Sequence, residues 1–285
     1  MFPERAGRCG RSSGCLVTGR VEFVYPRLTL PVSVTGRSCD LNCAHCGGHY
    51  LRGMATLEEA LGRRGVGYRS FLVSGGCDRQ GRVPHGERWA ELEALARRGS
   101  LNFHPGLVGE AEAAAMGMIA RAFSFDFVAD ERVIKDVYGL EAAPEDYLRS
   151  YRCLRRHGRV VPHICIGIMG GRIESECRAL EMLRREGAEA ISFIVFRPTP
   201  GTRLAGAAPP PPDAVAELLA HARALFPRTP LYLGCMRPGG RYREELDCLA
   251  LEAGIDKIVH PAAAARRLAA QMGLQVSTGE ECCAL

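Results

Sequence analysis

Three cysteines share the eight-residue stretch Cys39-Asp-Leu-Asn-Cys43-Ala-His-Cys46, with the spacing C-x3-C-x2-C, directly after an apolar run of strand length at residues 28–34. Three thiols cannot all pair as disulfides because three is odd, and they leave one position of a four-ligand zinc site unfilled. They can bind three irons of a [4Fe–4S] cluster, which leaves the fourth iron open to a small molecule that binds through nitrogen and oxygen. The alternatives are a zinc knuckle with a distant fourth ligand and a chance pattern in a cysteine-rich chain.

The composition limits the fold class and the compartment. The chain has 285 residues, of which 47% are hydrophobic, enough for one large α/β barrel or two small domains. It has no apolar run of 18 residues, so we expect no membrane-spanning helix and no membrane partner. Residues 1–14 lack the apolar segment of a secretory signal, so the 13 cysteines indicate reduced thiols in the cytoplasm, with a subset binding metal.

The net charge of +5 comes mostly from arginine. Arginine pairs recur on predicted outer helices, at 63–64, 97–98, 155–156, 184–185 and 266–267. They indicate either solvated helix faces or a docking surface for an acidic partner protein. Basic residues are not interleaved with aromatic ones as in nucleic-acid binding surfaces, so we expect no nucleic-acid partner.

Short apolar runs alternate with amphipathic helical patterns along the chain. The predicted strands are Leu28–Val34, Ser70–Val73, Leu101–Phe103, Ala122–Phe127, Pro162–Ile168, Ile191–Phe196, Leu231–Gly234 and Ile255–Val259. The predicted helices are Arg88–Arg98, Glu110–Arg121, Pro144–His157, Glu174–Glu186, Asp213–Leu225 and Glu244–Glu252. This alternation predicts a parallel (β/α)8 barrel of the TIM type, full or slightly open, over residues 28–272. An N-terminal extension, 1–27, contains Cys9 and Cys15, and 273–285 is expected to be a cysteine-bearing tail.

The cysteine motif, in its place after a first strand, resembles the signature of the radical S-adenosylmethionine (SAM) superfamily. In that superfamily Cys39, Cys43 and Cys46 would hold a [4Fe–4S] cluster whose open iron chelates the amino and carboxylate groups of SAM. Reductive cleavage of SAM then gives a 5'-deoxyadenosyl radical that abstracts a hydrogen atom. The resemblance implies a one-electron donor such as ferredoxin or flavodoxin. It covers residues 28–260, and only the cysteine motif is highly specific.

Several residues at predicted strand ends match places where the superfamily binds SAM. Ser74-Gly75-Gly76 resembles the turn that hydrogen-bonds the methionyl amino group, although Cys77 stands where an acid is common; a plain strand-to-loop turn is the alternative. His45 is at a position that often packs near the adenine, and an ordinary loop histidine is the alternative. Gly167 opens a glycine-containing fifth-strand motif that backs the adenine, and Phe196 begins the loop Phe196–Thr202, similar to one in the biotin-synthase-like branch.

Asp126 and Arg237 are candidate catalytic residues. Strand alternation puts Ser124 and Asp126 on one face and Phe123, Phe125 and Phe127 on the other. A carboxylate directed into a barrel is costly unless paired, so Asp126 contacts the SAM ribose or the substrate, or it forms a structural salt bridge with Arg172 or Arg197. Arg237 is suited to a bidentate pair with a substrate or SAM carboxylate.

Further cysteines suggest a second iron–sulfur cluster over the barrel mouth. Its candidate ligands are Cys9, Cys15, Cys235, Cys282 and Cys283, and the cluster would supply sulfur or relay electrons. The alternative is that the terminal thiols are adventitious or redox-sensitive and that Cys235 is simply a small buried residue.

Within the superfamily, the closest resemblance is to a subunit of the two-component lipoyl synthases. It rests on Val32-Ser-Val-Thr-Gly36, the Cys39 motif, His49-Tyr50-Leu51 with Met54, Phe196–Thr202, Gly234–Pro238 and the Cys282-Cys283 pair. It implies sulfur insertion into a protein-bound octanoyl chain, a second radical SAM subunit and an octanoylated lipoyl-carrier partner. The chain lacks the N-terminal C-x4-C-x5-C run of single-chain lipoyl synthases. The alternatives are an enzyme of the methylornithine synthase or hydrogenase maturase type that acts on a small amino acid, and a non-catalytic metal-binding scaffold subunit.

Overall fold

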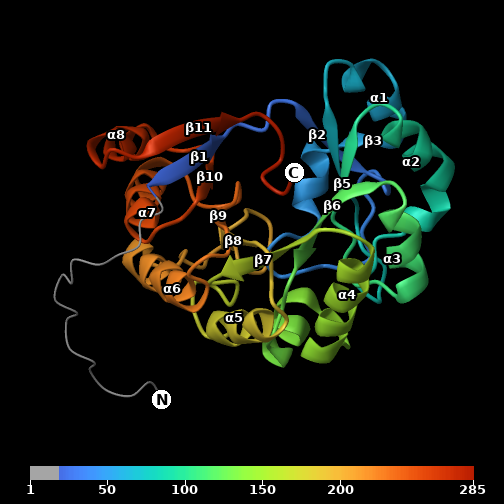
Figure 1. Cartoon of the computed structure of the whole chain (residues 1–285). Coiled ribbons are helices and arrows are strands. Elements are labelled where there is room, and N and C mark those ends of the chain that lie inside the picture. Colours follow the sequence, from blue (N-terminus) through green and yellow to red (C-terminus); the bar gives the residue numbers. More distant parts are fainter. Residues whose placement is uncertain (1–18) are drawn as a thin grey trace.

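A curled, parallel β-sheet with helices on its outer side forms the protein (Figure 1). The structure is a computed structural model and describes residues 19–285. Its strands are β1 Arg20–Val24, β2 Thr29–Ser33, β3 Ala55–Thr56, β4 Ser70–Ser74, β5 Ser100–Phe103, β6 Ala120–Asp126, β7 Val160–Ile166, β8 Ile191–Val195, β9 Leu231–Leu233, β10 Lys257–Val259 and β11 Gln275–Gly279. They are ordered β11-β1-β10-β9-β8-β7-β6-β5-β4-β2-β3, so the barrel is open between β11 and β3.

Eight α-helices connect or flank these strands in the part of the chain that the structure describes. They are α1 Leu57–Leu61, α2 Trp89–Ala96, α3 Glu110–Gly117, α4 Pro144–His157, α5 Glu176–Arg185, α6 Pro212–Leu225, α7 Gly240–Glu252 and α8 Ala263–Gln271. Within residues 19–285, none of them has both the length and the apolar composition of a membrane-crossing helix.

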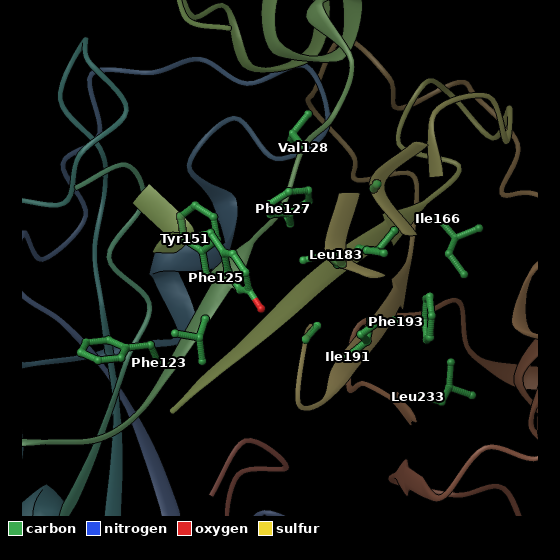
Figure 2. Packing of buried hydrophobic residues seen from close by; sticks show 14 of the residues in the cluster. Phe123, Phe125, Phe127, Val128, Tyr151, Ile166, Leu183, Ile191, Phe193 and Leu233 are labelled. Carbon is green, nitrogen blue, oxygen red and sulfur yellow. The ribbon is translucent and has the colours of Figure 1, made fainter. Parts of the chain in front are cut away.

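In strand β6, alternate side chains face the outer helices and the inside of the barrel. Phe123 and Phe125 point outward and are at most 1% exposed, and Phe125 packs against Tyr147 and Tyr151 of α4, with ring centroids 6.2 and 6.5 Å apart (Figure 2). Each buried aromatic contributes about 2–3 kcal/mol of transfer free energy. The side chains of Ser124 and Asp126, which alternate with these rings, face the inside of the sheet. The predicted assignment of faces is confirmed, and the main hydrophobic core lies between sheet and helices.

All eight predicted strands occur, as β2 and β4–β10, and all six predicted helices occur, with the bounds of α4 predicted without error. The pattern missed β1, β3, β11, α1 and α8. Gln275–Gly279 is polar and mostly exposed, so it carries no apolar alternation, yet it pairs with β1 over five residues. The expectation that 273–285 is a tail without a sheet element is therefore wrong for this strand.

Candidate functional site

The three motif thiols lie in the loop after β2, at the carboxyl edge of the sheet. Cys43 is buried, and Cys39 and Cys46 are half-buried. Two backbone hydrogen bonds fix the loop, from Ala44 N to Val137 O at 2.6 Å and from Leu204 N to Ala44 O at 3.0 Å. The side chains of Cys43 and Cys46 share a hydrogen bond, which lowers the pKa of Cys46 to about 7 and raises that of Cys43.

Gly76 allows the cysteine loop to pack closely against the turn after β4. A Cβ atom at this glycine would lie 1.9 Å from Ser38 O and 2.6 Å from the Cβ of Cys39, so only glycine allows the two segments to approach. The N–H of Gly76 donates to Thr35 Oγ1 at 2.7 Å, and Ser74 Oγ donates to His104 O at 3.0 Å. The predicted Ser74-Gly75-Gly76 turn is thus adjacent to the thiols; its contact with SAM stays a prediction.

His45 lies between the second and third cysteines and is half-buried. Burial lowers the pKa of its imidazole to about 4, so the ring is neutral at pH 7. Its ring lies edge-on to Tyr138 with centroids 5.3 Å apart, and its buried Nδ1 has no hydrogen-bond partner in the described structure. An unpartnered buried ring nitrogen is costly, so this position has an unused capacity to bind a ligand.

Asp126 faces the inside of the sheet beside two histidines. Its Oδ1 lies 3.4 Å from Nε2 of His104, and the rings of His104 and His163 are 5.9 Å apart. Burial opposes ionisation of Asp126, but the charges and hydrogen bond of His104 lower its pKa to about 2. Burial, with the charge of His104, lowers the pKa of His163 to about 4. The side chain of Asp126 is 38% exposed, which indicates free space beside it.

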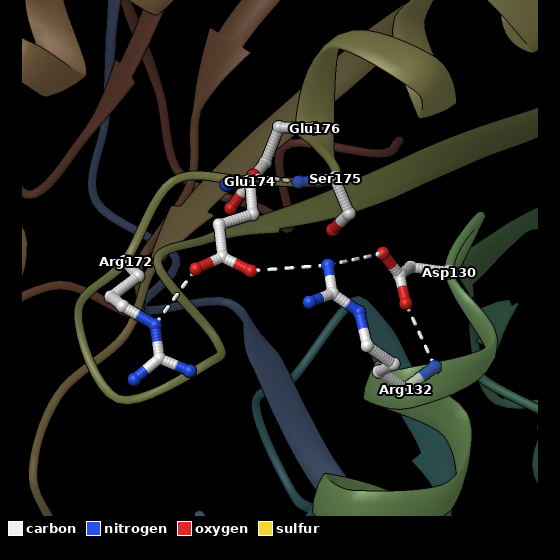
Figure 3. Close-up of polar contacts among 6 residues, drawn as sticks. All are labelled: Asp130, Arg132, Arg172, Glu174, Ser175 and Glu176. Atoms are coloured by element: carbon white, nitrogen blue, oxygen red, sulfur yellow. Dashed lines mark hydrogen bonds and ion pairs between the residues drawn. The ribbon is translucent and has the colours of Figure 1, made fainter. Parts of the chain in front are cut away.

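The predicted salt bridge of Asp126 with Arg172 or Arg197 does not form, so this alternative is wrong. Its ion-pair partner is His104, while Arg172 binds Glu174 at 2.8 Å, and Glu174 in turn binds Arg132 at 3.1 Å (Figure 3). His104 and His163 were not among the predicted site residues. The position of His104 directly after a predicted strand is the signal that could have identified it.

The loop after β7 gives Gly167 a structural reason to be glycine. Its φ is +73°, and a Cβ would lie 2.7 Å from Cγ of Pro210 in the proline-rich loop. Its N–H donates to Glu176 Oε1 at 2.7 Å, and the other oxygen of Glu176 accepts from the N–H groups of Glu174 and Ser175. The predicted contact of Gly167 with adenine stays a prediction.

Two predicted site residues have other roles. The side chain of Phe196 is 2% exposed and belongs to the core, so the predicted cofactor contact is wrong for its ring. Arg237 is fully buried, and its Nε and Nη2 atoms donate to the two carboxylate oxygens of Asp247 at 2.8 and 2.9 Å. Nη1 donates to Gly234 O at 2.6 Å. The predicted bidentate carboxylate partner is thus inside the chain, and the catalytic role predicted for Arg237 is wrong.

The segment after β11 turns into the barrel and brings Cys282 and Cys283 with it. Cys282 N donates to Thr29 Oγ1 at 2.7 Å, and Asn102 Nδ2 lies 3.3 Å from Cys282 Sγ. Lys257 Nζ donates to Cys283 O at 3.2 Å. The hydrogen bond from Cys283 lowers the pKa of Cys282 to about 6.

Cys235 lies within electrostatic reach of both vicinal thiols, and burial followed by the charge of Cys282 raises its pKa. Cys282 and Cys283 lie among the inner residues of the strands, and the grouping of Cys235 with them stays a prediction. The prediction that they lie over the mouth is wrong. Cys9 and Cys15 lie outside the described residues. Whether a second cluster binds here stays a prediction.

The donor set, three thiols in one loop, has the chemistry of a [4Fe–4S] ligand set. Within residues 19–285, no three or more His, Cys, Asp and Glu side chains converge closely enough to hold one metal ion. In a [4Fe–4S] cluster each thiolate binds a different iron, so the ligands surround the cluster without meeting at a point. Three thiols in one fixed loop, with a glycine pressed against that loop, satisfy this requirement.

Comparison with solved structures identifies the fold. Methylornithine synthase (PylB) matches with a TM-score of 0.63 and 16% identity, over 91% of this chain and 84% of that one. The FeFe-hydrogenase maturase HydG from Carboxydothermus hydrogenoformans matches with a TM-score of 0.57 and 15% identity, over 85% and 59%. SuiB from Streptococcus suis, in a structure bound to S-adenosylmethionine, gives 0.53 and 11%, over 78% and 52%.

The chain has the fold of radical SAM enzymes, an open parallel barrel. No family model and no curated protein matches its sequence. At these identities the structural likeness extends to the fold, and the chemistry has to be argued from the site.

Proposed function

We propose that the protein is a radical SAM enzyme, which cleaves S-adenosylmethionine to abstract a hydrogen atom from its substrate. The observation that carries the proposal is the loop of Cys39, Cys43 and Cys46 at the carboxyl edge of a parallel barrel, which is where such folds place their chemistry. When bound there, a [4Fe–4S] cluster supplies the electron and the open iron that SAM cleavage needs.

The chain's own residues would bind and orient the reactants. The three thiolates hold the cluster, and Ser74 to Gly76 with Asp126 seat SAM. His45 offers an unpartnered ring nitrogen next to the third thiol. Asp126 is ionised at neutral pH and its Oδ2 forms no hydrogen bond or ion pair within residues 19–285, so it can accept hydrogen bonds from a ribose or an amine. The enclosing sheet keeps water away from the radical and fixes the carbon that reacts.

The finer proposal is sulfur insertion into a protein-bound octanoyl chain, by a lipoyl synthase subunit in the cytoplasm. Its support is the group of Cys235, Cys282 and Cys283, three thiols near the inner face of the barrel that could ligate a second, sulfur-supplying cluster. This reaction requires a second radical SAM subunit, an octanoylated lipoyl-carrier protein and a ferredoxin or flavodoxin as the reductant.

A second candidate is hydrogen abstraction from a small amino acid, as in the methylornithine synthase type. It is favoured by the polarity of the interior, because an octanoyl chain needs an apolar channel. The inward side chains include His104, Asp126, His163, Asn102 and Ser124. Such a lining suits a small ligand with hydrogen-bonding groups.

The test begins with anaerobic reconstitution and detection of 5'-deoxyadenosine after reduction. Wild type is expected to cleave SAM, Cys43→Ser to lose cleavage, and the half-buried helical control Cys248→Ser to keep it. Cleavage that survives in Cys43→Ser would refute the proposal. Partner binding retained by a chain that never cleaves SAM would favour the scaffold alternative.

Iron analysis separates the two substrate classes. A fall from about eight irons to about four on removal of Cys282 and Cys283 means that these thiols hold a second cluster. That result favours sulfur insertion over the small-amino-acid reaction. About four irons in both proteins favours the small-amino-acid reaction. Incubation with an octanoyl-lysine peptide or with amino acids then shows which one accepts the radical.

A further inference from the structure

Residues 280–285 close the amino end of the barrel, opposite the edge that carries the cysteine motif. Leu28 N donates to Glu280 O at 2.9 Å, and Arg159 Nη1 donates to Ala284 O at 3.0 Å. Leu28 and Arg159 directly precede β2 and β7, so both contacts lie at strand starts. Ala284 is 0% exposed and packs against inner residues of three neighbouring strand starts, Val161, Ala190 and Tyr232. The segment therefore lies inside the ring of strands, as Figure 1 shows.

Within this segment, Cys282 presents its thiol to the barrel interior. Its Sγ lies 3.3 Å from Nδ2 of Asn102, which hydrogen-bonds Ser124 of the next strand at 2.9 Å. Asn102 and Ser124 precede His104 and Asp126 by two residues on the same faces of β5 and β6, a step of about 7 Å along a strand. Cys282 is half-buried. Its thiol thus forms the floor of the space in which the His104–Asp126 pair lies.

A second polar group just above this floor has no partner. Ser192 lies on β8 between Ile191 and Phe193, which belong to the outer hydrophobic core (Figure 2), so its own side chain faces inward. It follows Ala190, which packs against Ala284, by two residues on the same face. Ser192 Oγ is buried and forms no hydrogen bond within residues 19–285. An unpaired buried hydroxyl is costly, so this position is suited to a polar group that a ligand supplies.

The polarity of the floor favours one kind of ligand. The hydrogen bond from Cys283 that lowers the pKa of Cys282 to about 6 makes this group a thiolate at neutral pH, and a thiolate accepts hydrogen bonds. The end of an octanoyl chain would leave the Ser192 hydroxyl unpaired and would take the thiolate out of polar surroundings, and both changes cost free energy. A hydrogen-bonding group at the end of a small substrate satisfies both side chains.

We propose that Cys282 and Ser192 contact a polar end group of a small substrate at the floor of the barrel, and that they select substrates which reach this depth. This contact deepens the small-amino-acid candidate, and the identity of the substrate rests on the proposed function. A thiol that ligates a second cluster is not free for such a contact, so the two roles of Cys282 exclude each other.

The experiment is alkylation of Cys282 by iodoacetamide in the reconstituted full chain with SAM, measured by mass spectrometry of the peptide that contains this residue. Each standard amino acid is added in turn, and an octanoyl-lysine peptide is added separately. At least one amino acid is expected to slow the alkylation by about tenfold at about ten times its Kd, and the octanoyl-lysine peptide is expected to leave it unchanged. Cys248, half-buried on the outer helix α7, is the internal control and should react at one rate throughout.

Three results would overturn the proposal. They are a Cys282 thiol that no amino acid protects, protection by the octanoyl-lysine peptide alone, and alkylation that occurs before but not after iron reconstitution. The last result would make Cys282 a cluster ligand. Protection of Cys282 by an amino acid in a chain that forms no 5'-deoxyadenosine would refute the proposed function and keep the floor contact.

Ser192→Ala separates a ligand contact from a structural role. Because Ser192 Oγ has no partner to lose within residues 19–285, this variant is expected to unfold in urea at the wild-type midpoint. The protecting amino acid should bind it about tenfold more weakly, because one hydrogen bond to the ligand is lost. A lowered unfolding midpoint with unchanged protection of Cys282 would show that Ser192 is structural and would contradict its part in the floor.

Discussion

Replacing Arg237 by methionine tests whether this arginine is structural, as its contacts indicate, or catalytic. Both side chains of the Arg237–Asp247 pair are 0% exposed. The substitution removes two hydrogen bonds to Asp247, whose Oδ2 then keeps only the N–H of Ala262 at 2.8 Å, and it releases Gly234 O. Breaking a buried pair on one side costs about 3–5 kcal/mol, because the remaining carboxylate is buried without a counter-charge.

The double variant Arg237→Met, Asp247→Leu removes both charges. Replacement of a buried ion pair by apolar groups of similar size is often neutral or stabilising, so we expect the double variant to recover most of the stability. With a urea slope of about 3 kcal/mol per M, the single variant should lower the unfolding midpoint by about 1–1.7 M. Urea unfolding followed by circular dichroism, on wild type and the two variants, measures this difference.

SAM binding measured on the same proteins decides between the two roles. A structural Arg237 predicts that the folded double variant binds SAM as wild type does. The reasoning fails if Arg237→Met unfolds at the wild-type urea concentration while SAM binding is lost in both variants. That result would mean that the guanidinium contacts a ligand in solution instead of Asp247.

Three further changes follow from contacts described above. Gly76→Ala should strongly reduce the iron bound after reconstitution, because its Cβ would overlap Ser38 O, whereas Gly86→Ala, with open space, should bind iron as wild type does. His104→Gln should raise the pKa of Asp126 from about 2, as measured by carboxyl 13C NMR. A carboxyl group whose pKa is lowered by folding stabilises the fold at pH values above its unfolded pKa of about 3.9, and this stabilisation is lost as the pH falls through about 2. The variant should therefore unfold at a higher pH than wild type does. Phe125→Ala should lower the free energy of unfolding by about 3–5 kcal/mol, measured in urea.

The sequence predicted the barrel because strands buried between helices read as apolar runs at regular intervals. The runs at β4–β9 carry this signal, and their order in the chain alone gives a parallel sheet. It could not predict β11, which is stabilised by its ladder to β1 and not by burial of its own side chains. Pairing between segments about 250 residues apart leaves no local pattern.

The site was predicted in part for a similar reason. A local spacing defines Cys39, Cys43 and Cys46, so the sequence contains the whole signal. The role of Arg237 depends on Asp247 of α7, which forms a buried ion pair with it. An arginine next to a strand end is visible in the sequence, but the acid that neutralises it is visible only in three dimensions.

The inner face of the sheet is polar where a filled TIM barrel would be apolar. Asn102 and Ser124 hydrogen-bond each other at 2.9 Å, and His163 satisfies its Nδ1 with Val161 O at 2.9 Å, so these groups avoid the cost of unpaired burial. The stability of the fold therefore comes chiefly from the outer layer, where Phe125 meets α4. It follows that inner substitutions such as His163→Gln should leave the free energy of unfolding within about 1 kcal/mol of wild type. Their effect should appear instead in ligand binding, and a large loss of stability in His163→Gln would show that the interior is part of the core.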